Sequence, residues 1–319
     1  MSPDRLLKMM DKDGDGRISR SEFTGKKRPF SFFDSNNDGY ATRQEIETAM
    51  GKAAAGGPTA GPDTRSGDKP EGKISLKAVG EEISCAIARH RRCDAAPAIA
   101  RGLFETGLRP SFPDGIVCAG IDEHFAISYS STRGREYYHG GIDMPANFGT
   151  PIIAIADGVV LTNISEAKSA RGAEVIVRHT PKDTGIPLWI YSQYAHLNKP
   201  SPLQPGQRIR MGDVIGETGN SGSTPQGGMA LKMRRPAIHF AIWYSDSPKY
   251  AIDKQGHVLP MDGWWMDPTA LYRLTPPFDS VAMKALPENE KFVKVPVRVE
   301  GGGTLPTSTR LIWPYACKN

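Results

Sequence analysis

The chain has 319 residues, of which 39% are hydrophobic and 24% charged, and its formal net charge at pH 7 is +5. This composition is ordinary for a folded protein with one well-packed domain and smaller modules. It contains no apolar run of membrane-spanning length, and no basic stripe with interleaved aromatic residues argues for a nucleic-acid partner. The mild positive charge suits an anionic polymer and an ordinary solvated surface equally well.

Two acidic stretches near the N-terminus predict calcium loops. Residues 11–22 and 34–45 both fit the EF-hand pattern D-x-[DN]-x-[DN]-G-x5-E. In such a loop, positions 1, 3 and 5 supply side-chain oxygens, position 7 a backbone carbonyl and position 12 a bidentate glutamate. The expected ligands are Asp11, Asp13, Asp15, Arg17 and Glu22 in the first loop, and Asp34, Asn36, Asp38, Tyr40 and Glu45 in the second. The sequence therefore predicts two Ca²⁺ ions in an EF-hand pair over residues 1–50, with acidic turns that bind no metal as the alternative.

The connection between the two loops is short. Residues 23–33 leave little chain for full helices, and we expect the aromatic residues Phe30, Phe32 and Phe33 to close a core that both loops share. Because so small a module buries little apolar area, we favour calcium as a structural staple. A calcium switch is the alternative, and it would need a hydrophobic groove that opens on binding.

The composition changes after residue 50. Residues 51–72 are rich in Ala, Gly and Pro and include charged residues, which is typical of a flexible linker. From residue 73, apolar residues at helical spacing predict one helix over residues 73–92, with charged residues such as Arg89 off its apolar face, and a second over residues 95–106. We therefore expect residues 73–120 to form a helical subdomain.

The four cysteines, Cys85, Cys93, Cys118 and Cys317, form no CxxC pair. An even number outside a metal-binding pattern suggests two disulfides, and we favour Cys85–Cys93 with Cys118–Cys317 among the three possible pairings. Disulfides would indicate an oxidising compartment, whereas four reduced thiols are the alternative. The chain starts at Met1 without an apolar signal segment, so the protein is either cytoplasmic or has lost a signal.

From residue 121 onward, short β-rich runs at residues 152–161, 173–179 and 188–196 are separated by turn residues, and short connections favour antiparallel pairing. His139 and Asp143 flank Gly140-Gly141, which is a poor helix interior. In an extended strand they would lie roughly 13 Å apart. We therefore expect the glycine pair to form a bend that brings the imidazole and the carboxylate together.

A third ligand is expected from the apolar strand that contains His239. Three protein ligands leave one tetrahedral position open to water, which is typical of a catalytic zinc. The sequence therefore predicts one Zn²⁺ held by His139, Asp143 and His239.

These motifs resemble the lysostaphin/LytM-type zinc endopeptidases of bacterial cell walls. The resemblance covers residues 121–273 and rests on HxxxD at residues 139–143, the segments 149–154 and 156–160, Tyr194-Ala195-His196-Leu197, and Ala237-Ile238-His239-Phe240. It implies that His196 assists the attacking water and the tetrahedral oxyanion. The family's late motif is HxH, and here Ala237 replaces its first histidine, so position 237 lacks a catalytic group.

The fold class that we predict is α+β and multidomain: an EF-hand pair (1–50), a linker (51–72), a helical subdomain (73–120), an antiparallel β-rich LytM-type peptidase core (121–273) and an extended tail (274–319) anchored by Cys317. The resemblance implies a zinc endopeptidase that cleaves peptide cross-links of peptidoglycan, weakened by Ala237, whether that alanine is engineered or natural. The alternative is a silent zinc-binding module that binds cell wall or activates a separate wall hydrolase. Either protein would be a monomer in the periplasm or outside the cell, with wall peptide and other wall hydrolases as partners.

Overall fold

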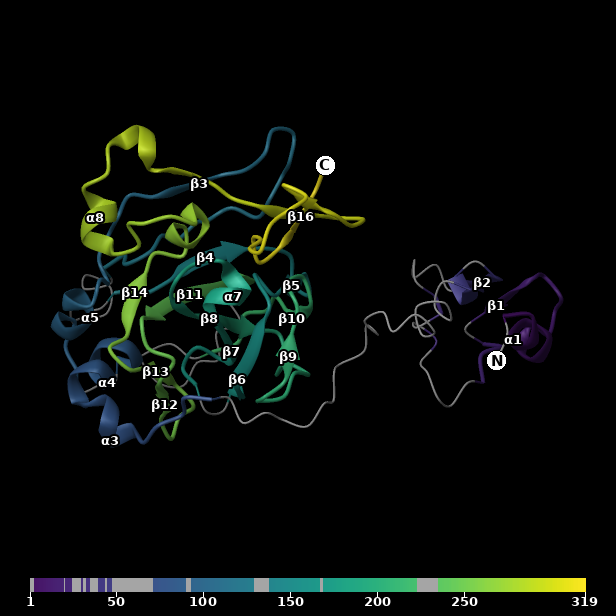
Figure 1. The fold of residues 1–319 in the computed structure, drawn as a ribbon, viewed down its shortest axis with the longest axis horizontal. Coiled ribbons are helices and arrows are strands. Elements are labelled where there is room, and N and C mark those ends of the chain that lie inside the picture. Colours follow the sequence, from purple (N-terminus) through teal and green to yellow (C-terminus); the bar gives the residue numbers. More distant parts are fainter. Residues whose placement is uncertain are drawn as a thin grey trace. The chain divides into compact units, whose positions relative to one another are not determined.

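The computed structural model describes residues 3–19, 21–24, 30, 33–34, 40–43, 45–47, 71–89, 93–128, 138–166, 169–222 and 235–319. The chain divides into two compact units, residues 1–63 and residues 64–319 (Figure 1). Of the predicted linker, residues 51–72, only residues 71 and 72 are among the described residues. None of the helices in the described ranges is both long enough and apolar enough to cross a membrane.

The first unit combines a helix with a two-stranded ribbon. Helix α1 spans Pro3–Met10, and strands β1 (Arg17–Ser19) and β2 (Tyr40–Thr42) pair antiparallel, with Ile18 opposite Ala41. The apolar side chains of this unit are buried together: Leu6, Met10, Ile18, Phe30, Phe33, Ala41 and Ile46. The expected role of Phe30 and Phe33 in a shared core is confirmed, whereas Phe32 lies outside the described residues.

A seven-stranded sheet forms the centre of the second unit, with the strand order β14-β11-β8-β7-β6-β9 and with β4 also paired to β11. All pairs in this sheet are antiparallel. Its strands are β4 (Ile142–Pro145), β6 (Gly158–Ile164), β7 (Ala173–His179), β8 (Trp189–Leu197), β9 (Arg208–Ile209), β11 (Ala237–Ser245) and β14 (Trp264–Met266). Nearly every residue of β7, β8 and β11 is buried, so these strands form the core, and the predicted antiparallel β-rich core is confirmed.

Smaller elements surround the sheet. Strand β5 (Pro151–Ile153) pairs with β10 (Val214–Glu217), and β12 (Tyr250–Ile252) pairs with β13 (Val258–Pro260). The turns α7 (Pro181–Thr184) and η3 (Ala270–Arg273) complete this part of the unit.

The region that precedes the sheet is helical but more broken than its sequence predicted. It contains α3 (Leu76–Val79), α4 (Glu81–Ala88) and α5 (Ala96–Ala100). The helix expected over residues 73–92 is interrupted at Gly80, which adopts φ 85°, a conformation that a continuous helix excludes. The second helix ends at Ala100 instead of residue 106, shortly before Gly102 at φ 92°.

The C-terminal region is also more structured than the extended tail that was expected. It contains α8 (Ser280–Lys284), η4 (Glu288–Glu290), β15 (Phe292–Lys294), β16 (Val297–Val299), β17 (Thr304–Leu305) and β18 (Ala316–Cys317). Strand β15 pairs in parallel with β3 (Arg109–Ser111) from the start of the second unit. Asp279 begins α8 because its side chain accepts a hydrogen bond of 2.9 Å from the backbone of Ala282, a preferred N-cap interaction.

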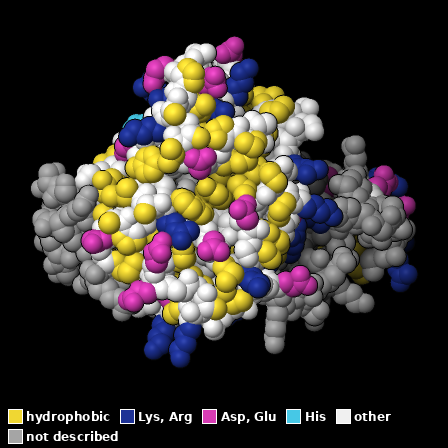
Figure 2. Space-filling model, turned by 60° about the vertical axis from the view of Figure 1, so that its left-hand side comes forward, with side chains coloured by type: hydrophobic (Ala, Val, Ile, Leu, Met, Phe, Trp, Pro, Cys, Tyr) yellow, Lys and Arg dark blue, Asp and Glu magenta, His cyan; other side chains and the backbone are white. Residues whose placement is uncertain are grey.

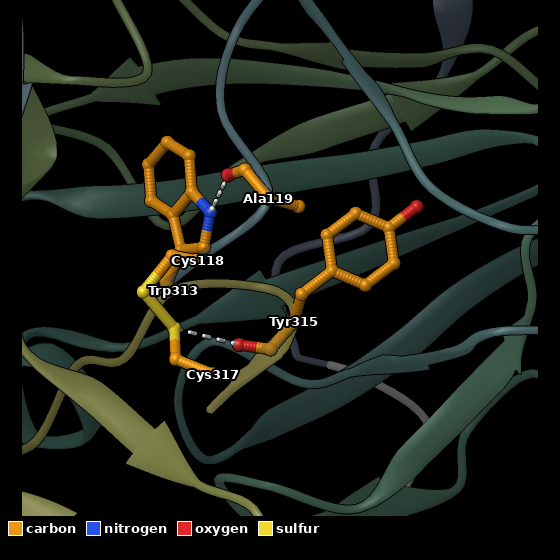
Figure 3. Close-up of a disulfide and its surroundings, with 5 residues drawn as sticks. All are labelled: Cys118, Ala119, Trp313, Tyr315 and Cys317. Carbon is orange, nitrogen blue, oxygen red and sulfur yellow. Dashed lines mark hydrogen bonds between the residues drawn. A yellow bond between two sulfur atoms is a disulfide. The ribbon is translucent and has the colours of Figure 1, made fainter. Parts of the chain in front are cut away.

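Two disulfides, Cys85–Cys93 and Cys118–Cys317, are present, and they are the pairing favoured from the sequence. Figure 3 shows the second of them beside Trp313, whose indole nitrogen donates a hydrogen bond of 2.9 Å to the backbone oxygen of Ala119. The disulfide and the indole together fasten the end of the chain to the segment around residue 118.

The exposed surface is mixed in character. On the face shown in Figure 2, acidic and basic side chains lie singly among apolar ones. This pattern fits the ordinary solvated surface that the modest net charge of +5 allows.

Candidate metal centre

The pairing of β4 with β11 places Asp143 directly opposite His239. The Nδ1 atom of His239 lies 3.1 Å from Oδ1 of Asp143. The Nε2 atom of His139 lies 3.0 Å from the same carboxylate oxygen and 3.0 Å from Nδ1 of His239. The structure therefore brings together the three residues that the sequence proposed as metal ligands.

The glycine pair makes this convergence possible. Gly140 adopts φ +75°, and a Cβ atom there would lie 2.7 Å from Nη1 of Arg89. A Cβ atom on Gly141 would lie 2.7 Å from Cε1 of His239. The predicted bend is present, and each glycine is needed because another side chain occupies the space beside it.

The donor set fits a divalent cation. The Nδ1 atom of His139 lies 3.1 Å from the backbone oxygen of His124. A carbonyl oxygen can only accept, so Nδ1 carries the proton and Nε2 presents a lone pair. Ligand atoms bound at about 2.0 Å to a tetrahedral ion would lie about 3.3 Å apart, close to the observed 3.0–3.1 Å.

Burial and mutual contacts place the ligands in the protonation states that metal binding requires. Burial opposes ionisation of Asp143, but its contacts with the imidazoles of His139 and His239 outweigh burial and hold the pKa of that carboxyl far below its usual value. Burial lowers the pKa of His239 well below its ordinary value, even though Asp143 opposes this change. The carboxylate is thus charged and the imidazole neutral.

His196 lies beside this group. It is near the end of β8, adopts φ 65°, and its ring centroid is 5.8 Å from that of His239. Its Nδ1 atom donates a hydrogen bond of 2.8 Å to the backbone oxygen of Ser221, which makes Nε2 the acceptor nitrogen of the ring.

Ser221 is a supporting residue that the sequence analysis missed. Its hydroxyl donates to the oxygen of Leu197 at 2.6 Å and accepts from the backbone of Ala173 at 3.0 Å. Ser221 therefore ties the loop to β7 and β8 on either side of His196. A single serine in a glycine-rich loop gave no sequence signal for this role.

Ala237 begins β11, two residues before His239, and its backbone nitrogen donates to the oxygen of Gly219 at 3.1 Å. Alternate residues of a strand share a face, so Ala237 and His239 point to the same side. The methyl group is fully buried and offers neither a proton donor nor an acceptor.

The first predicted calcium loop brings three of its expected ligand residues together. Ligand atoms of Asp11, Asp13 and Asp15 lie within 4.8 Å of one another. Gly14 and Gly16 adopt φ 75° and 83°, and their backbone nitrogens donate to the carboxylate of Asp11 at 2.7 and 3.0 Å. Arg17, whose carbonyl was expected to bind calcium, is the first residue of β1.

The glutamates at position 12 of the two loops are held alike. Glu22 accepts hydrogen bonds of 2.7 and 2.8 Å from the side chain and backbone of Ser19, and these lower its pKa to about 2. Glu45 accepts equivalent bonds of 2.7 and 3.0 Å from Thr42. Asp34 is buried and Tyr40 begins β2. Asn36 and Asp38 lie outside the described residues.

Three other histidines do not supply side chains to the candidate metal centre. His179 is fully buried between the oxygen of Asp157 and the hydroxyl of Ser192, at 2.7 and 2.8 Å. His257 pairs with Asp253 at 2.8 Å. His124 has an exposed side chain, and its contribution to the centre is its backbone oxygen. Within the described ranges, none of these three histidines belongs to a group of three or more side chains that could hold a metal ion.

Comparisons with known proteins agree with both sites. Residues 137–251 match the profile of peptidase family M23, and residues 4–24 match that of the EF hand. A protein of Buchnera aphidicola described as an uncharacterized metalloprotease is 29% identical over 105 residues, and another of Haemophilus influenzae is 36% identical over 89 residues. These matches cover 33% and 28% of this chain but only 23% and 17% of the relatives, so the chain spans less than a quarter of their length.

Two solved structures illustrate the similarity. A zinc containing peptidase from Vibrio cholerae is 22% identical, with 44% of this chain and 36% of that chain covered and a TM-score of 0.30. The catalytic domain of lysostaphin from Staphylococcus simulans is also 22% identical, with 44% and 80% covered and a TM-score of 0.27.

The His-Asp-His group on the antiparallel sheet lies within the segment whose sequence is similar to that of metallopeptidases. More specifically, residues 137–251 match peptidase family M23, and they are preceded by a segment, residues 4–24, that matches the EF hand.

Proposed function

We propose that this protein is a zinc-dependent endopeptidase that cleaves peptide cross-links of peptidoglycan, with its rate limited by Ala237. The observation that carries the proposal is the mutual approach, to 3.0–3.1 Å, of three buried ligand atoms from His139, Asp143 and His239. When bound, zinc would polarise the scissile carbonyl and lower the pKa of water from 15.7 to roughly 7.

His196 is the proton-handling residue in this proposal. Its Nδ1–H donates a hydrogen bond of 2.8 Å to the backbone oxygen of Ser221. Its Nε2 is therefore the atom that would accept a proton from water or donate one to the substrate during cleavage. A group acting in this way must be held in place, and the hydroxyl of Ser221 supports that position through Ala173 and Leu197.

Position 237 would complete the catalytic group. On a strand, a side chain there lies about 6–7 Å from that of His239 on the same face, within reach of the open side of the metal. Losing a positioned acid or base typically costs roughly 10²–10⁴-fold in rate. The three ligands do not include position 237, so the proposal expects zinc binding to survive.

The remaining parts of the proposal concern setting and cofactors. The protein would bind one Zn²⁺ and two Ca²⁺ ions, the latter as a structural staple of the first unit. The two disulfides suit an oxidising compartment, and we propose a monomer in the periplasm or outside the cell that acts on wall peptide.

The deciding experiment is the substitution Ala237→His. Zinc-loaded native protein, Ala237→His and Ala237→Phe are incubated with purified cell walls, and released cross-linked peptide fragments are separated by chromatography. We expect the histidine to raise cleavage at least tenfold. The phenylalanine tests ring volume without acid–base chemistry and should not raise it. An unchanged rate in Ala237→His at full zinc occupancy would count against the role assigned to this position.

Ala237 itself favours a second candidate, a silent zinc-binding module that binds cell wall or activates a separate wall hydrolase. In that case neither the native protein nor Ala237→His releases fragments. Instead, the native protein sediments with purified walls or accelerates a purified wall hydrolase added to the same assay.

A further inference from the structure

Arg89 lies at the end of α4, outside the segment that matches the peptidase family. It caps the helix in the left-handed conformation, with φ 53°, and its backbone nitrogen donates to the oxygen of Cys85 at 3.1 Å. Cys85 is bonded to Cys93, only eight residues further on. The disulfide therefore joins two residues that flank Arg89 in the sequence.

The guanidinium of Arg89 contacts the metal-binding bend. Its Nη1 atom donates to the backbone oxygens of Tyr138 and His139, at 2.5 and 3.0 Å. The missing side chain of Gly140 makes room for this nitrogen, because a Cβ atom there would lie 2.7 Å from it. The first glycine of the bend is thus matched to a residue 51 positions earlier in the chain.

These contacts complete the hydrogen bonding of the ligand residue. The backbone nitrogen of His139 donates to Ile127 at 2.8 Å, and its Nδ1 atom donates to His124 at 3.1 Å. Its backbone oxygen is bound by Arg89. The main-chain donor, the main-chain acceptor and the second ring nitrogen of His139 are therefore all held.

A tryptophan fixes the guanidinium from another side. The Cζ atom of Arg89 lies 5.0 Å from the ring of Trp265, which is 1% exposed and donates from its indole nitrogen to the oxygen of Ala86 at 2.9 Å. Trp265 belongs to β14, which pairs with β11, the strand of His239. Arg89 therefore connects α4 to the elements that supply His139 and His239.

We propose that Arg89 is a positioning residue of the metal centre: it fixes the backbone of His139 so that Nε2 points at Asp143 and His239. The inference rests on the proposed function only in using the same metal site, and it holds whether or not the chain cleaves wall peptide. Partners that orient a metal ligand typically change metal affinity or activity by 10–100-fold when they are mutated.

The test compares Arg89→Ala and Arg89→Lys with Arg101→Ala. Arg101 is a matched control in the same subdomain: it lies 5.0 Å from the ring of the neighbouring Trp264 and pairs with Glu82 at 3.2 Å. Zinc affinity is measured by competition with a chromogenic chelator, and apo-protein stability by thermal unfolding. We expect Arg89→Ala to weaken zinc binding about 10–100-fold and Arg101→Ala to leave it unchanged.

Arg89→Lys separates position from charge. It keeps the positive charge near the metal but cannot reproduce the planar guanidinium, so we expect a zinc affinity between the native and alanine values. If Arg89→Ala fails to fold, Arg89→Lys still carries the test. Zinc affinity that is unchanged or higher in the folded Arg89 variants overturns the proposal, since removing a nearby cation would by itself favour zinc.

The disulfide provides a second and independent measurement. The double replacement of Cys85 and Cys93 by serine should lower zinc affinity in the native background. In the Arg89→Ala background it should have little further effect, because the group that it positions is already missing. Equal losses in both backgrounds would overturn the link between this turn and the metal. Failure of the peptidase assay would leave these affinity comparisons intact.

Discussion

The two candidate metal-binding regions of this chain are built in opposite ways. The buried centre collects donors from His139, Asp143 and His239, which are up to 100 positions apart in the chain, whereas the first calcium loop takes its predicted donors from residues 11–22. In the centre, the imidazoles hold the pKa of Asp143 far below its usual value. In the loop, a hydrogen bond from the backbone of Asp15 lowers the pKa of Asp13, but desolvation and the charges of Asp15 and Glu22 outweigh it and raise that pKa.

The difference shows what holds the donor atoms of each site in position. Strand pairing within a large apolar core places Asp143 opposite His239, so the fold of the sheet positions these buried donors. The loop gathers like charges on a unit with only a small core, so bound calcium would supply part of the folding free energy of that unit.

The largest expected effect tests the preformed centre. Asp143→Asn replaces the only charged ligand by a neutral amide, and we expect zinc affinity to fall by more than the 10–100-fold that is typical when a partner orienting a ligand is mutated. Chelator competition measures it. Asp253→Asn is the matched control, because Asp253 is also a buried carboxylate paired with a histidine, His257, at 2.8 Å. Similar losses in both variants would show that the assay reports general destabilisation.

The next prediction concerns how protons act on the buried sheet. Burial lowers the pKa of His179 to about 4, although a hydrogen bond to Asp157 opposes this. The unfolded chain binds this proton below pH 6.5, whereas the folded protein binds it only near pH 4, so stability falls as the pH drops through this window. The pKa difference of His179 between the folded and unfolded protein contributes about 3 kcal/mol to the free energy of unfolding at neutral pH.

Urea unfolding at several pH values measures this contribution. His179→Gln can keep one donor to Asp157 and one acceptor for Ser192, yet it does not titrate. The difference between the two proteins should therefore shrink from pH 7 toward pH 4, because only the native protein loses the contribution. A constant difference across this range would contradict the assignment.

The smallest effect concerns the exposed loop. Glu22→Gln should weaken calcium binding about tenfold, because the bidentate charge at position 12 is lost. Calorimetric titration measures the affinity, and Glu47→Gln, which removes an exposed partner of Arg43, is the control. All five tryptophans lie beyond residue 188, so thermal unfolding followed by their fluorescence reports the second unit and should remain unchanged. A shift there would break the separation between the two regions.

The sequence predicted the parts of the site that depend on local pattern. His139 and Asp143 around a glycine pair indicated a bend, and the apolar alternation around His239 indicated a buried strand. It could not indicate Arg89, which looks like a solvent-facing charge on a helix until the fold brings it to Gly140. The same applies to Ser221, whose hydroxyl acquires its role only when β7 and β8 are side by side.

Helix limits and the C-terminal region were harder to predict for a different reason. Gly80 divides a continuous helical pattern because its backbone adopts φ 85°. The spacing of apolar residues does not predict the backbone conformation of a single glycine. The prolines after residue 274 suggested an extended chain, yet β15 and β16 find partners in β3 and β18. Such pairing depends on contacts that are distant in the chain.

The buried end of the chain limits how this protein can be shortened. Leu311, Ile312, Trp313 and Tyr315 are at most 1% exposed, and the backbone of this segment bonds to Ile153 and Ile155 at 2.9 Å. A fragment trimmed to the family match, residues 137–251, would leave the apolar surface beneath these residues open to water and to other copies. Anyone who wishes to transplant the candidate metal centre must therefore carry residues 311–317, and Cys118, which is bonded to Cys317, as part of it.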